Sequence, residues 1–286
     1  MDWTRRRERY RAVIEGESCI HPGSVYDPIS ARIAEDLGFE VGMFAGSIAS
    51  MTVLGAPDLI VMSLTEFAGQ AYRICRAGDL ALMCDADHGY GNALSVMRTV
   101  EELEAAGVAA FTIEDTELPA PYGSDGPRLL TLEEGVGKMK AALAARSDPR
   151  LVIAGRTSAA AIAGMDEALR RIAAYEAAGV DAVFLTGIRT RDQVEAIAAT
   201  VDIPVILGAA GPEIQDLGYL ARHGVRICLQ GHQPFMAAVQ AVHATLKALR
   251  EGTPPADLAG VAPPELMRNV TRDGDYRRWI EDYLGG

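Results

Sequence analysis

The sequence predicts an α/β protein built as a (β/α)8 barrel of the TIM type, with an N-terminal helix and a C-terminal helical extension. Short runs rich in Val, Ile, Leu and Phe alternate eight times with longer helical segments along the 286 residues. The apolar runs are nearly continuous, as expected of parallel strands covered by helices. No Gly-x-Gly-x-x-Gly motif opens a helical segment, so a doubly wound open sheet is only the structural alternative.

Each predicted strand ends in a glycine or a polar cluster, which marks the end of a strand. The expected strands are 18–25, 40–47, 80–87, 108–115, 151–158, 180–187, 203–210 and 225–232. The expected helices are 28–37, 65–77, 92–106, 131–146, 166–178, 190–200, 213–223 and 234–250. The segment EAAGV occurs at 104–108 and again at 176–180. In both copies the glycine is expected to end a helix in the left-handed conformation, directly before a strand.

The two ends of the chain lie outside these eight units. Trp3, Tyr10 and Ile14 recur at helical spacing, and we interpret Arg5-Arg6-Arg7 as the solvated face of the same helix rather than as a basic tail. A Pro-rich linker at 252–267 leads to a last helix near 275–284. We therefore expect a barrel over residues 1–250, and a linker and helix over 251–286 that pack on the same barrel or on a neighbouring subunit.

Composition excludes several classes of partner. The chain has 27 basic and 39 acidic residues and a net charge of −12, which disfavours binding to nucleic acid or to an anionic membrane. No run reaches the roughly 18 apolar residues that span a bilayer, and no signal peptide is recognisable. The four cysteines are scattered without a Cys-x-x-Cys pair, as in reduced, buried thiols. A cytoplasmic protein is expected.

Polar residues gather where the predicted strands end, which is where barrel enzymes carry their catalytic groups. These residues are Gly46 and Ser47, Asp85 and Asp87, Glu114 and Asp115, Arg156, and His232. Four carboxylates at one barrel mouth repel one another unless a cation lies between them. Carboxylate oxygens and water suit Mg2+, with Mn2+ as a second candidate. Arg156 is then left to bind a substrate carboxylate.

Each of these residues also has a purely structural interpretation. Asp85 and Asp87 could cap the helix that starts near Asn92. Glu114 and Asp115 could form a solvated turn, Arg156 could pair with one of the acids, and His232 could be a buried histidine with its hydrogen bonds satisfied. Alternation along the strand places Asp85 and Asp87 on one face, with Cys84 and Ala86 on the other.

The segments Asp-Ala-Asp-His-Gly-Tyr-Gly (85–91), Ile-Glu-Asp (113–115) and Arg-Thr (156–157) resemble the isocitrate lyase/phosphoenolpyruvate mutase superfamily. Gly-Ala-Pro-Asp (55–58) and Leu-Thr-Glu-Phe (64–67) are also typical of it, and the resemblance covers roughly residues 15 to 245. The resemblance implies Mg2+-dependent chemistry on α-oxo-carboxylates through an enolate.

The same resemblance implies roles for individual residues. Asp85 corresponds to the main metal-anchoring carboxylate, while Asp87, Glu114 and Asp58 would hold metal-bound waters. Arg156, together with the backbone at Gly46 and Ser47, would hold the substrate carboxylate and the enolate oxygen. The resemblance also implies a homo-oligomer, either a dimer or a tetramer built from dimers that exchange a C-terminal helix.

Departures from the superfamily pattern indicate which of its reactions this chain catalyses. Its carbon–carbon lyases carry Lys-Lys-Cys-Gly-His in the loop after strand four, but here 116–127 reads TELPAPYGSDGP, without Cys, Lys or His. Decarboxylation needs only an electron sink and a modest proton donor. His232 and the segment 89–104 resemble the oxaloacetate decarboxylase branch, with His232 positioning substrate or handling a proton. The segment GAAGP (208–212) lacks the tyrosine and asparagine expected there in that branch. A 3-substituted oxaloacetate is therefore a second candidate substrate.

The prediction is therefore Mg2+-dependent decarboxylation of oxaloacetate, or a 3-substituted oxaloacetate, to pyruvate and CO2. One alternative is a carbon–carbon lyase acting on a 2-hydroxy acid, a 2-methylmalate or a methylisocitrate-type acid, with Tyr122 or a metal-bound water as the acid. Another is a non-catalytic barrel that binds a dicarboxylate or a metal. The expected ligand in each case is a small α-oxo-dicarboxylate or a relative of it.

Overall fold

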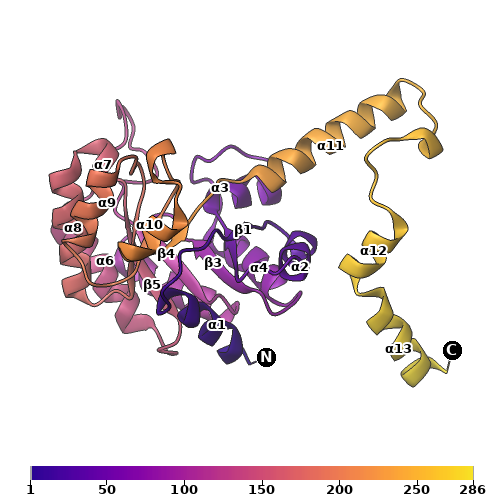
Figure 1. Cartoon of the computed structure of the whole chain (residues 1–286), viewed down its shortest axis with the longest axis horizontal. Coiled ribbons are helices and arrows are strands. Elements are labelled where there is room, and N and C mark those ends of the chain that lie inside the picture. The colour runs from indigo at the N-terminus through magenta and orange to yellow at the C-terminus, as the bar shows by residue number, and fades with distance from the viewer. Residues whose placement is uncertain (1, 286) are drawn as a thin grey trace.

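The computed structural model describes residues 2–285 and shows eight parallel strands in one sheet, in the order β1 to β8 (Figure 1). The sheet closes because Ile20, just before β1, pairs in parallel with Ile227 of β8. The strands are β1 (Gly23–Ser24), β2 (Val41–Phe44), β3 (Ala81–Asp85), β4 (Ala110–Glu114), β5 (Val152–Thr157), β6 (Ala182–Leu185), β7 (Val205–Leu207) and β8 (Val225–Cys228). The predicted barrel is confirmed.

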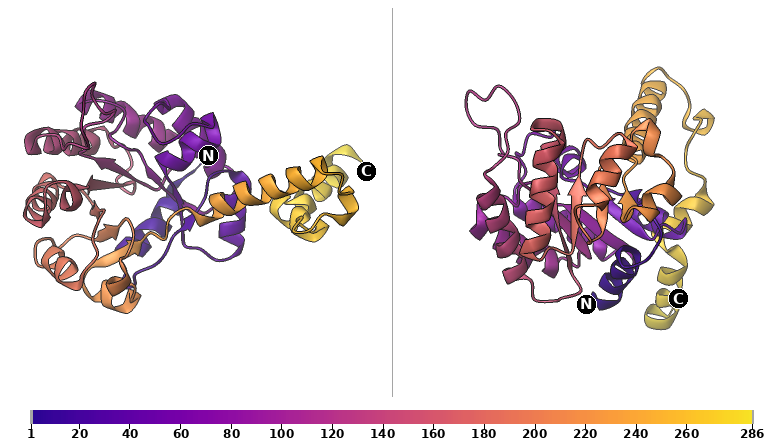
Figure 2. Two further views of the ribbon diagram at one scale, coloured as in Figure 1. Left: turned by 90° about the horizontal axis from the view of Figure 1, so that it is seen from above. Right: turned by 60° about the vertical axis from the view of Figure 1, so that its left-hand side comes forward.

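Helices surround the strands, as the view from above shows (Figure 2). Those predicted from the sequence are α1 (Thr4–Ile14), α2 (Pro28–Asp36), α4 (Leu64–Cys75), α5 (Ala93–Ala105), α6 (Leu132–Ala145), α8 (Met165–Ala178), α9 (Arg191–Ala198), α10 (Leu217–Arg222), α11 (Gln233–Arg250) and α13 (Asp273–Leu284). Those that were not predicted are α3 (Gly46–Ala49), η1 (Ser50–Leu54), α7 (Ala159–Ile162), η2 (Pro212–Ile214), η3 (Pro255–Asp257) and α12 (Pro264–Thr271). Most of these are single turns, which are too short to show a helical period.

Alternation along the strands divides the buried side chains between two cores. Met83, Phe184 and Ile227 fill the inside of the barrel, whereas Cys84 packs between the sheet and the helices. Tyr10 of α1 belongs to the inner core, and its hydroxyl lies 3.3 Å from the Met83 sulfur. The N-terminal helix therefore packs against the interior of the barrel, leaving the opposite end of the strands for the functional cavity.

The interpretation of Arg5-Arg6-Arg7 as a solvated face is correct for Arg5 and wrong for its two neighbours, which are buried. Arg6 donates to the Cys75 carbonyl at the end of α4 (2.5 Å). Arg7 donates to the Glu104 carbonyl near the end of α5 (2.7 Å). Carbonyls at helix ends lack partners within the helix and attract cations, so burial of these arginines is offset by their hydrogen bonds.

The chain beyond β8 leaves the barrel along α11 and returns through α12 and α13 (Figure 1). None of the 18 residues of α11 is buried. The returning segment contacts α2, where Arg32 donates to the Val270 carbonyl (3.0 Å) and Arg272 pairs with Asp36 (2.7 Å). Across residues 2–285, no helix has both the length and the apolar character needed to span a membrane.

Candidate active site

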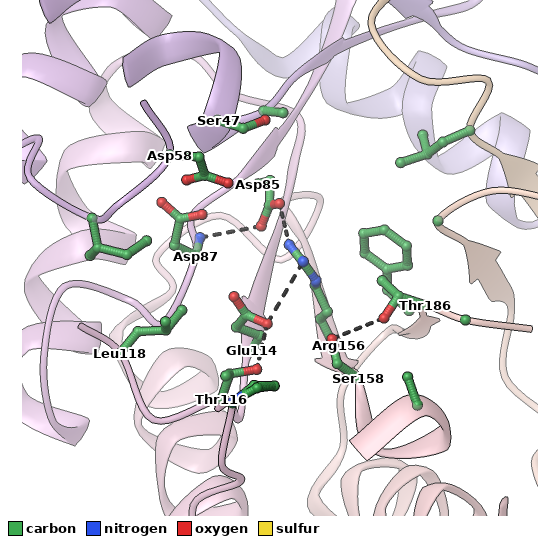
Figure 3. Close-up of a pocket in the computed structure, with 18 of the residues that line it drawn as sticks. Ser47, Asp58, Asp85, Asp87, Glu114, Thr116, Leu118, Arg156, Ser158 and Thr186 are labelled. Atoms are coloured by element: carbon green, nitrogen blue, oxygen red, sulfur yellow. Dashed lines mark hydrogen bonds and ion pairs between the residues drawn. The ribbon is translucent and has the colours of Figure 1, made fainter. Parts of the chain in front are cut away.

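A cavity of about 720 Å³ opens at the C-terminal ends of the strands, and polar side chains gather on one side of it (Figure 3). The residues predicted for the site that line it are Ser47, Asp58, Asp85, Asp87, Glu114, Arg156 and His232. Gly46 immediately precedes Ser47 and lies against the Asp87 carboxylate. Residues from β3, β4, β5 and the loops after β2 and β8 thus meet in one place.

Arg156, the penultimate residue of β5, bridges the acids of two other strands. Its guanidinium forms a short ion pair with Asp85, which ends β3, and lies 3.7 Å from the carboxylate of Glu114, which ends β4. Two threonines orient these acids. Thr112 donates to Asp85 (3.0 Å), and Thr116 donates to Glu114 (2.8 Å). The two carboxylates and the arginine are therefore held by hydrogen bonds on both sides.

Asp87 lies two residues beyond Asp85 in an uncommon backbone conformation, with φ of 48°. Its amide donates to Asp85 Oδ1 (3.2 Å). A Cβ built on Gly46 would stand 2.3 Å from Asp87 Oδ2, so only glycine leaves room for this carboxylate. Burial raises the pKa of Asp87 well above its ordinary value, and the charges of Asp85 and Glu114 raise it further.

The cavity carries an excess of negative charge. Burial is the largest cause that raises the pKa of Asp58 and of Glu114; Asp85 adds to both, and Arg156 opposes both. Four carboxylates thus face a single arginine, and a divalent cation would restore the balance. Within the described part of the chain, no three His, Cys, Asp or Glu side chains stand close enough to coordinate one ion directly. The set instead suits Mg2+, which keeps several waters and takes one or two carboxylates.

His232 precedes the first residue of α11 and lines the cavity through its side chain. Its Nδ1 lies 2.8 Å from the hydroxyl of Ser24 on β1, which fixes the ring, and within residues 2–285 Nε2 has no hydrogen-bond partner. Burial lowers the pKa of His232, while the charges of Asp85 and Asp58 oppose that shift. The ring is therefore held mainly neutral, with Nε2 available for a ligand.

The other side of the cavity is apolar. Phe184 on β6 packs under the Arg156 guanidinium, whose carbon lies 5.3 Å from the ring centroid. Small residues follow β7, where Gly208 and Ala209 line the cavity. Further apolar residues that line the cavity are Met43, Leu59, Ile60, Leu118, Ala120, Ala161, Ile162 and Leu229.

Three residues singled out in the sequence lie elsewhere. Asp115 was expected at the mouth, but it is fully buried outside the barrel, where it accepts from Arg171 (2.9 Å) and Tyr175 (2.5 Å). Alternation explains this, because Glu114 already faces inward. His88 is buried without lining the cavity, and Tyr122 projects fully into solvent. The alternative interpretation, in which Asp85 and Asp87 cap α5, is wrong, because Asn92 performs that role by accepting from the Leu94 amide (3.0 Å).

Several residues that contact or orient the site residues were not predicted from the sequence. Thr112 lies two residues before Glu114 and pairs in register with Asp85, so alternation on strand four could have revealed it. Ser24 has no such signal, since β1 is only two residues long and its partner is 208 positions away. Ser158 and Thr186 also line the cavity and share a hydrogen bond of 2.9 Å.

Comparison with known proteins places this geometry in context. The family model described as phosphoenolpyruvate phosphomutase matches residues 12–250. The chain is 58% identical over 285 residues to an oxaloacetate decarboxylase of Bradyrhizobium diazoefficiens, covering 100% of this chain and 99% of the relative. It is 28% identical to phosphoenolpyruvate phosphomutase from Streptomyces platensis subsp. rosaceus, with a TM-score of 0.87 over 97% of this chain and 99% of that one. A phosphonopyruvate hydrolase solved with oxalate and Mg2+ has a TM-score of 0.85 at 28% identity, over 98% and 99% of the two chains.

Proposed function

The chain belongs to the phosphoenolpyruvate phosphomutase family, and we propose that within this family it is an oxaloacetate decarboxylase that forms pyruvate and CO2. The observation that carries the proposal is the identity of 58% to an oxaloacetate decarboxylase over the whole length of both chains. The loop 116–127 supports it, because this loop contains no thiol, amine or imidazole that could serve a carbon–carbon lyase as acid or base.

The metal assigned to the site is Mg2+, with Mn2+ as the second candidate. Asp85 would bind it directly, and Asp87, Glu114 and Asp58 would hold its waters. The bound ion would supply positive charge that draws electrons toward the α-oxo group while the bond to the leaving carboxylate breaks. The excess of buried carboxylates over cations in the cavity supports this assignment.

Protein groups bind the substrate on the polar side of the cavity. Arg156 offers a planar guanidinium that matches a carboxylate. Gly46 and Ser47 are the first residues of α3, so their backbone N–H groups have no carbonyl partner within that helix. These three residues hold the substrate carboxylate and the C2 oxygen, on which negative charge develops as CO2 leaves. Donors placed at such an oxygen stabilise the transition state more than the ground state.

The carbon that loses CO2 must take up a proton, and His232 is placed to handle that proton and to position the substrate. Its Nε2 has no hydrogen-bond partner among the residues that the structure describes, while Ser24 restrains Nδ1. A neutral imidazole with its proton on Nε2 donates a hydrogen bond that positions the substrate, whereas the protonated form can transfer its Nε2 proton to C3 and then recover a proton from solvent.

Pyruvate formation tests the proposal directly. The protein with oxaloacetate and Mg2+ should release pyruvate well above the rate of metal-catalysed decarboxylation in buffer, and EDTA should abolish the difference. Asp85→Asn should lose at least about 100-fold in rate, since one misplaced group can cost that much. A rate equal to the buffer background, or an unaffected Asp85→Asn variant, would overturn the proposal.

The apolar side of the cavity supports a second substrate, a 3-substituted oxaloacetate. Gly208 and Ala209 leave space beside Phe184, where an alkyl group on C3 could pack. Comparing kcat/KM for oxaloacetate and 3-methyloxaloacetate tests this, and Ala209→Leu should lower only the second value. The lyase alternative predicts glyoxylate or pyruvate release from hydroxy acids. Tyr122 is unsuited as its acid, because its side chain projects into solvent away from the cavity.

We further propose a cytoplasmic homo-oligomer, either a dimer or a tetramer, with a barrel domain over residues 1–250 and an arm over 251–286 that packs on a neighbouring subunit. Exposed apolar residues support this assembly, and they lie along α11 (Met236, Val239, Val242, Leu246, Leu249) and α13 (Trp279, Ile280, Tyr283). The four free, buried cysteines suit a reducing compartment, and the charge of −12 argues against nucleic-acid partners.

A further inference from the structure

A buried lysine lies behind the acidic side of the cavity. Lys138 on α6 is 3% exposed, whereas Lys140 and Lys247 are exposed. Its ammonium donates to the carbonyl of His88 (2.9 Å), and in the described part of the chain no carboxylate lies within 4 Å of it. Burial of a cation without a paired carboxylate costs several kcal/mol, so such a residue is not explained by packing alone.

The hydrogen bond made by Lys138 belongs to a set that holds the segment after β3. Three consecutive carbonyls accept from three different elements. The Asp87 carbonyl accepts from the Glu114 amide of β4 (2.8 Å), and the Gly89 carbonyl accepts from Thr99 of α5 (3.0 Å). The His88 carbonyl between them accepts from Lys138 of α6. This segment carries Asp87 into the cavity, although His88 itself does not reach it.

Asp87 needs this support because of its backbone conformation. A left-handed φ in a residue with a side chain costs roughly 1–2 kcal/mol, and it persists only where the surroundings impose it. The conformation aims the carboxylate at Gly46, where no side chain competes for the space. Loss of the hydrogen bond to the neighbouring carbonyl would let Asp87 relax away from that position.

The positive charge of Lys138 also stabilises the acidic side of the cavity. Burial lowers the pKa of Lys138, and the charges of Glu134 on the same helix, and then of Glu114 and Asp115 at the end of β4, oppose that shift. Lys138 therefore partly offsets the negative charge of the cavity from behind, without entering it. Lys138 can stabilise the site when no metal is bound and leave the cavity free for the metal when it is.

We propose that Lys138 is a positioning residue of the metal site, which holds the His88 carbonyl so that Asp87 points into the cavity. The inference rests on the proposed function in taking Mg2+ as the ion. Residues that orient metal-binding groups typically change metal affinity 10–100-fold when replaced. Lys138→Met should therefore weaken Mg2+ binding by about 10–100-fold.

The test is calorimetric titration of EDTA-treated protein with Mg2+ in the absence of substrate. Lys138→Met should raise the Kd by that factor, and Lys138→Arg should recover part of the loss. Lys140→Met removes the same charge from an exposed position of the same helix, and it should bind as the wild type does. Lys138→Gln removes the charge, and its side chain ends one bond short of the lysine ammonium, so it too should lose the hydrogen bond to the His88 carbonyl. It serves if the methionine variant fails to fold.

A second measurement needs no metal. The crystal structure of metal-free Lys138→Gln or Lys138→Met should show the Asp87 carboxylate moved away from Gly46. Wild-type Kd values in these variants, or an unmoved Asp87 in their structures, would overturn the proposal. Absence of Mg2+ binding by the wild type would instead contradict the assignment of the metal. In that case the position of Asp87 in the metal-free variant structures would still test the role of Lys138.

Discussion

Gly46 and Asp87 illustrate how single residues shape the cavity. The carboxylate of Asp87 occupies the space that any side chain at position 46 would need, and its own backbone is left-handed. The absence of a side chain at Gly46, after β2, thus makes room for the carboxylate of Asp87, after β3. The site depends on this contact because the carboxylate would otherwise turn toward solvent, where its charge is better hydrated.

Replacement of Gly46 tests the contact. Gly46→Ala places a methyl group 2.3 Å from Asp87 Oδ2, so the carboxylate must shift. We expect kcat/KM to fall by about 100-fold, a typical cost of displacing a group by about 1 Å. Gly137→Ala is the control, since its Cβ meets nothing within 4 Å, and activity should be unchanged. Equal activity of both variants would show that the position of Asp87 is unimportant.

Asp87 should also make stability depend on pH. Its pKa is raised in the folded protein, whereas in the unfolded chain it ionises near pH 4. Between these values the folded state binds more protons, so the free energy of unfolding falls as pH rises through that window. Asp87→Asn removes the buried charge and should raise the Tm of metal-free protein at pH 8 by about 2 °C or more.

The measurement is a thermal melt in EDTA from pH 4 to pH 8. The difference between Asp87→Asn and the wild type should shrink toward pH 4, where the buried carboxyl is protonated. Asp202→Asn at an exposed position should show no such trend. A difference that is constant with pH would contradict a raised pKa at Asp87.

At the scale of the element, α11 differs from every other long helix of the barrel. It is amphipathic, with apolar residues at positions 236, 239, 242, 246 and 249, yet none of its 18 residues is buried. A helix gains little stability in water without an apolar face that packs on something. In the proposed oligomer, a second copy of this chain would cover that apolar face.

Two glutamates on the apolar face of α11 test this. Val242→Glu with Leu246→Glu should shift the mass measured by light scattering toward the monomer, because buried charges disrupt an interface. Gln240→Glu with Lys247→Glu places two glutamates on exposed positions away from that row and should leave the mass unchanged. A wild-type chain that is already monomeric would contradict the proposed oligomer.

At the scale of the whole molecule, the proposed metal links the cavity to overall stability. The acids that face it come from β3, β4 and the loop after η1, so a bound ion would hold these parts of the barrel together. A ligand that binds only the folded state stabilises it by about 2.7 kcal/mol at 100 times its Kd.

Thermal melts with and without Mg2+ measure this link. For a chain of this size, saturating Mg2+ should raise the Tm by about 5–10 °C. The shift should vanish in Asp85→Asn and should grow as the pH rises, because the acids with raised pKa values must lose protons to bind the ion. An equal shift in Asp85→Asn would place the ion elsewhere.

The sequence by itself determined the barrel and most of the polar side of the cavity. Eight apolar runs, each ended by a glycine or a polar cluster, are local patterns that the sequence shows directly. Asp85, Glu114 and Arg156 lie at the ends of predicted strands, so their place at the cavity could be predicted without knowledge of distant contacts. The resemblance added Asp58, which lies in a loop with no period. The same alternation, applied to Asp115, would have placed it outside the barrel.

The distant residues that support these groups are known only from the folded structure. Ser24 meets His232, Arg6 meets the end of α4, and Lys138 meets the loop after β3 across separations of 50 residues or more. Such contacts arise when the barrel closes and its helices pack, so no local period records them. The physical reason is that periodicity reports which face of an element is buried, whereas the partner of a buried polar group depends on how the elements are assembled.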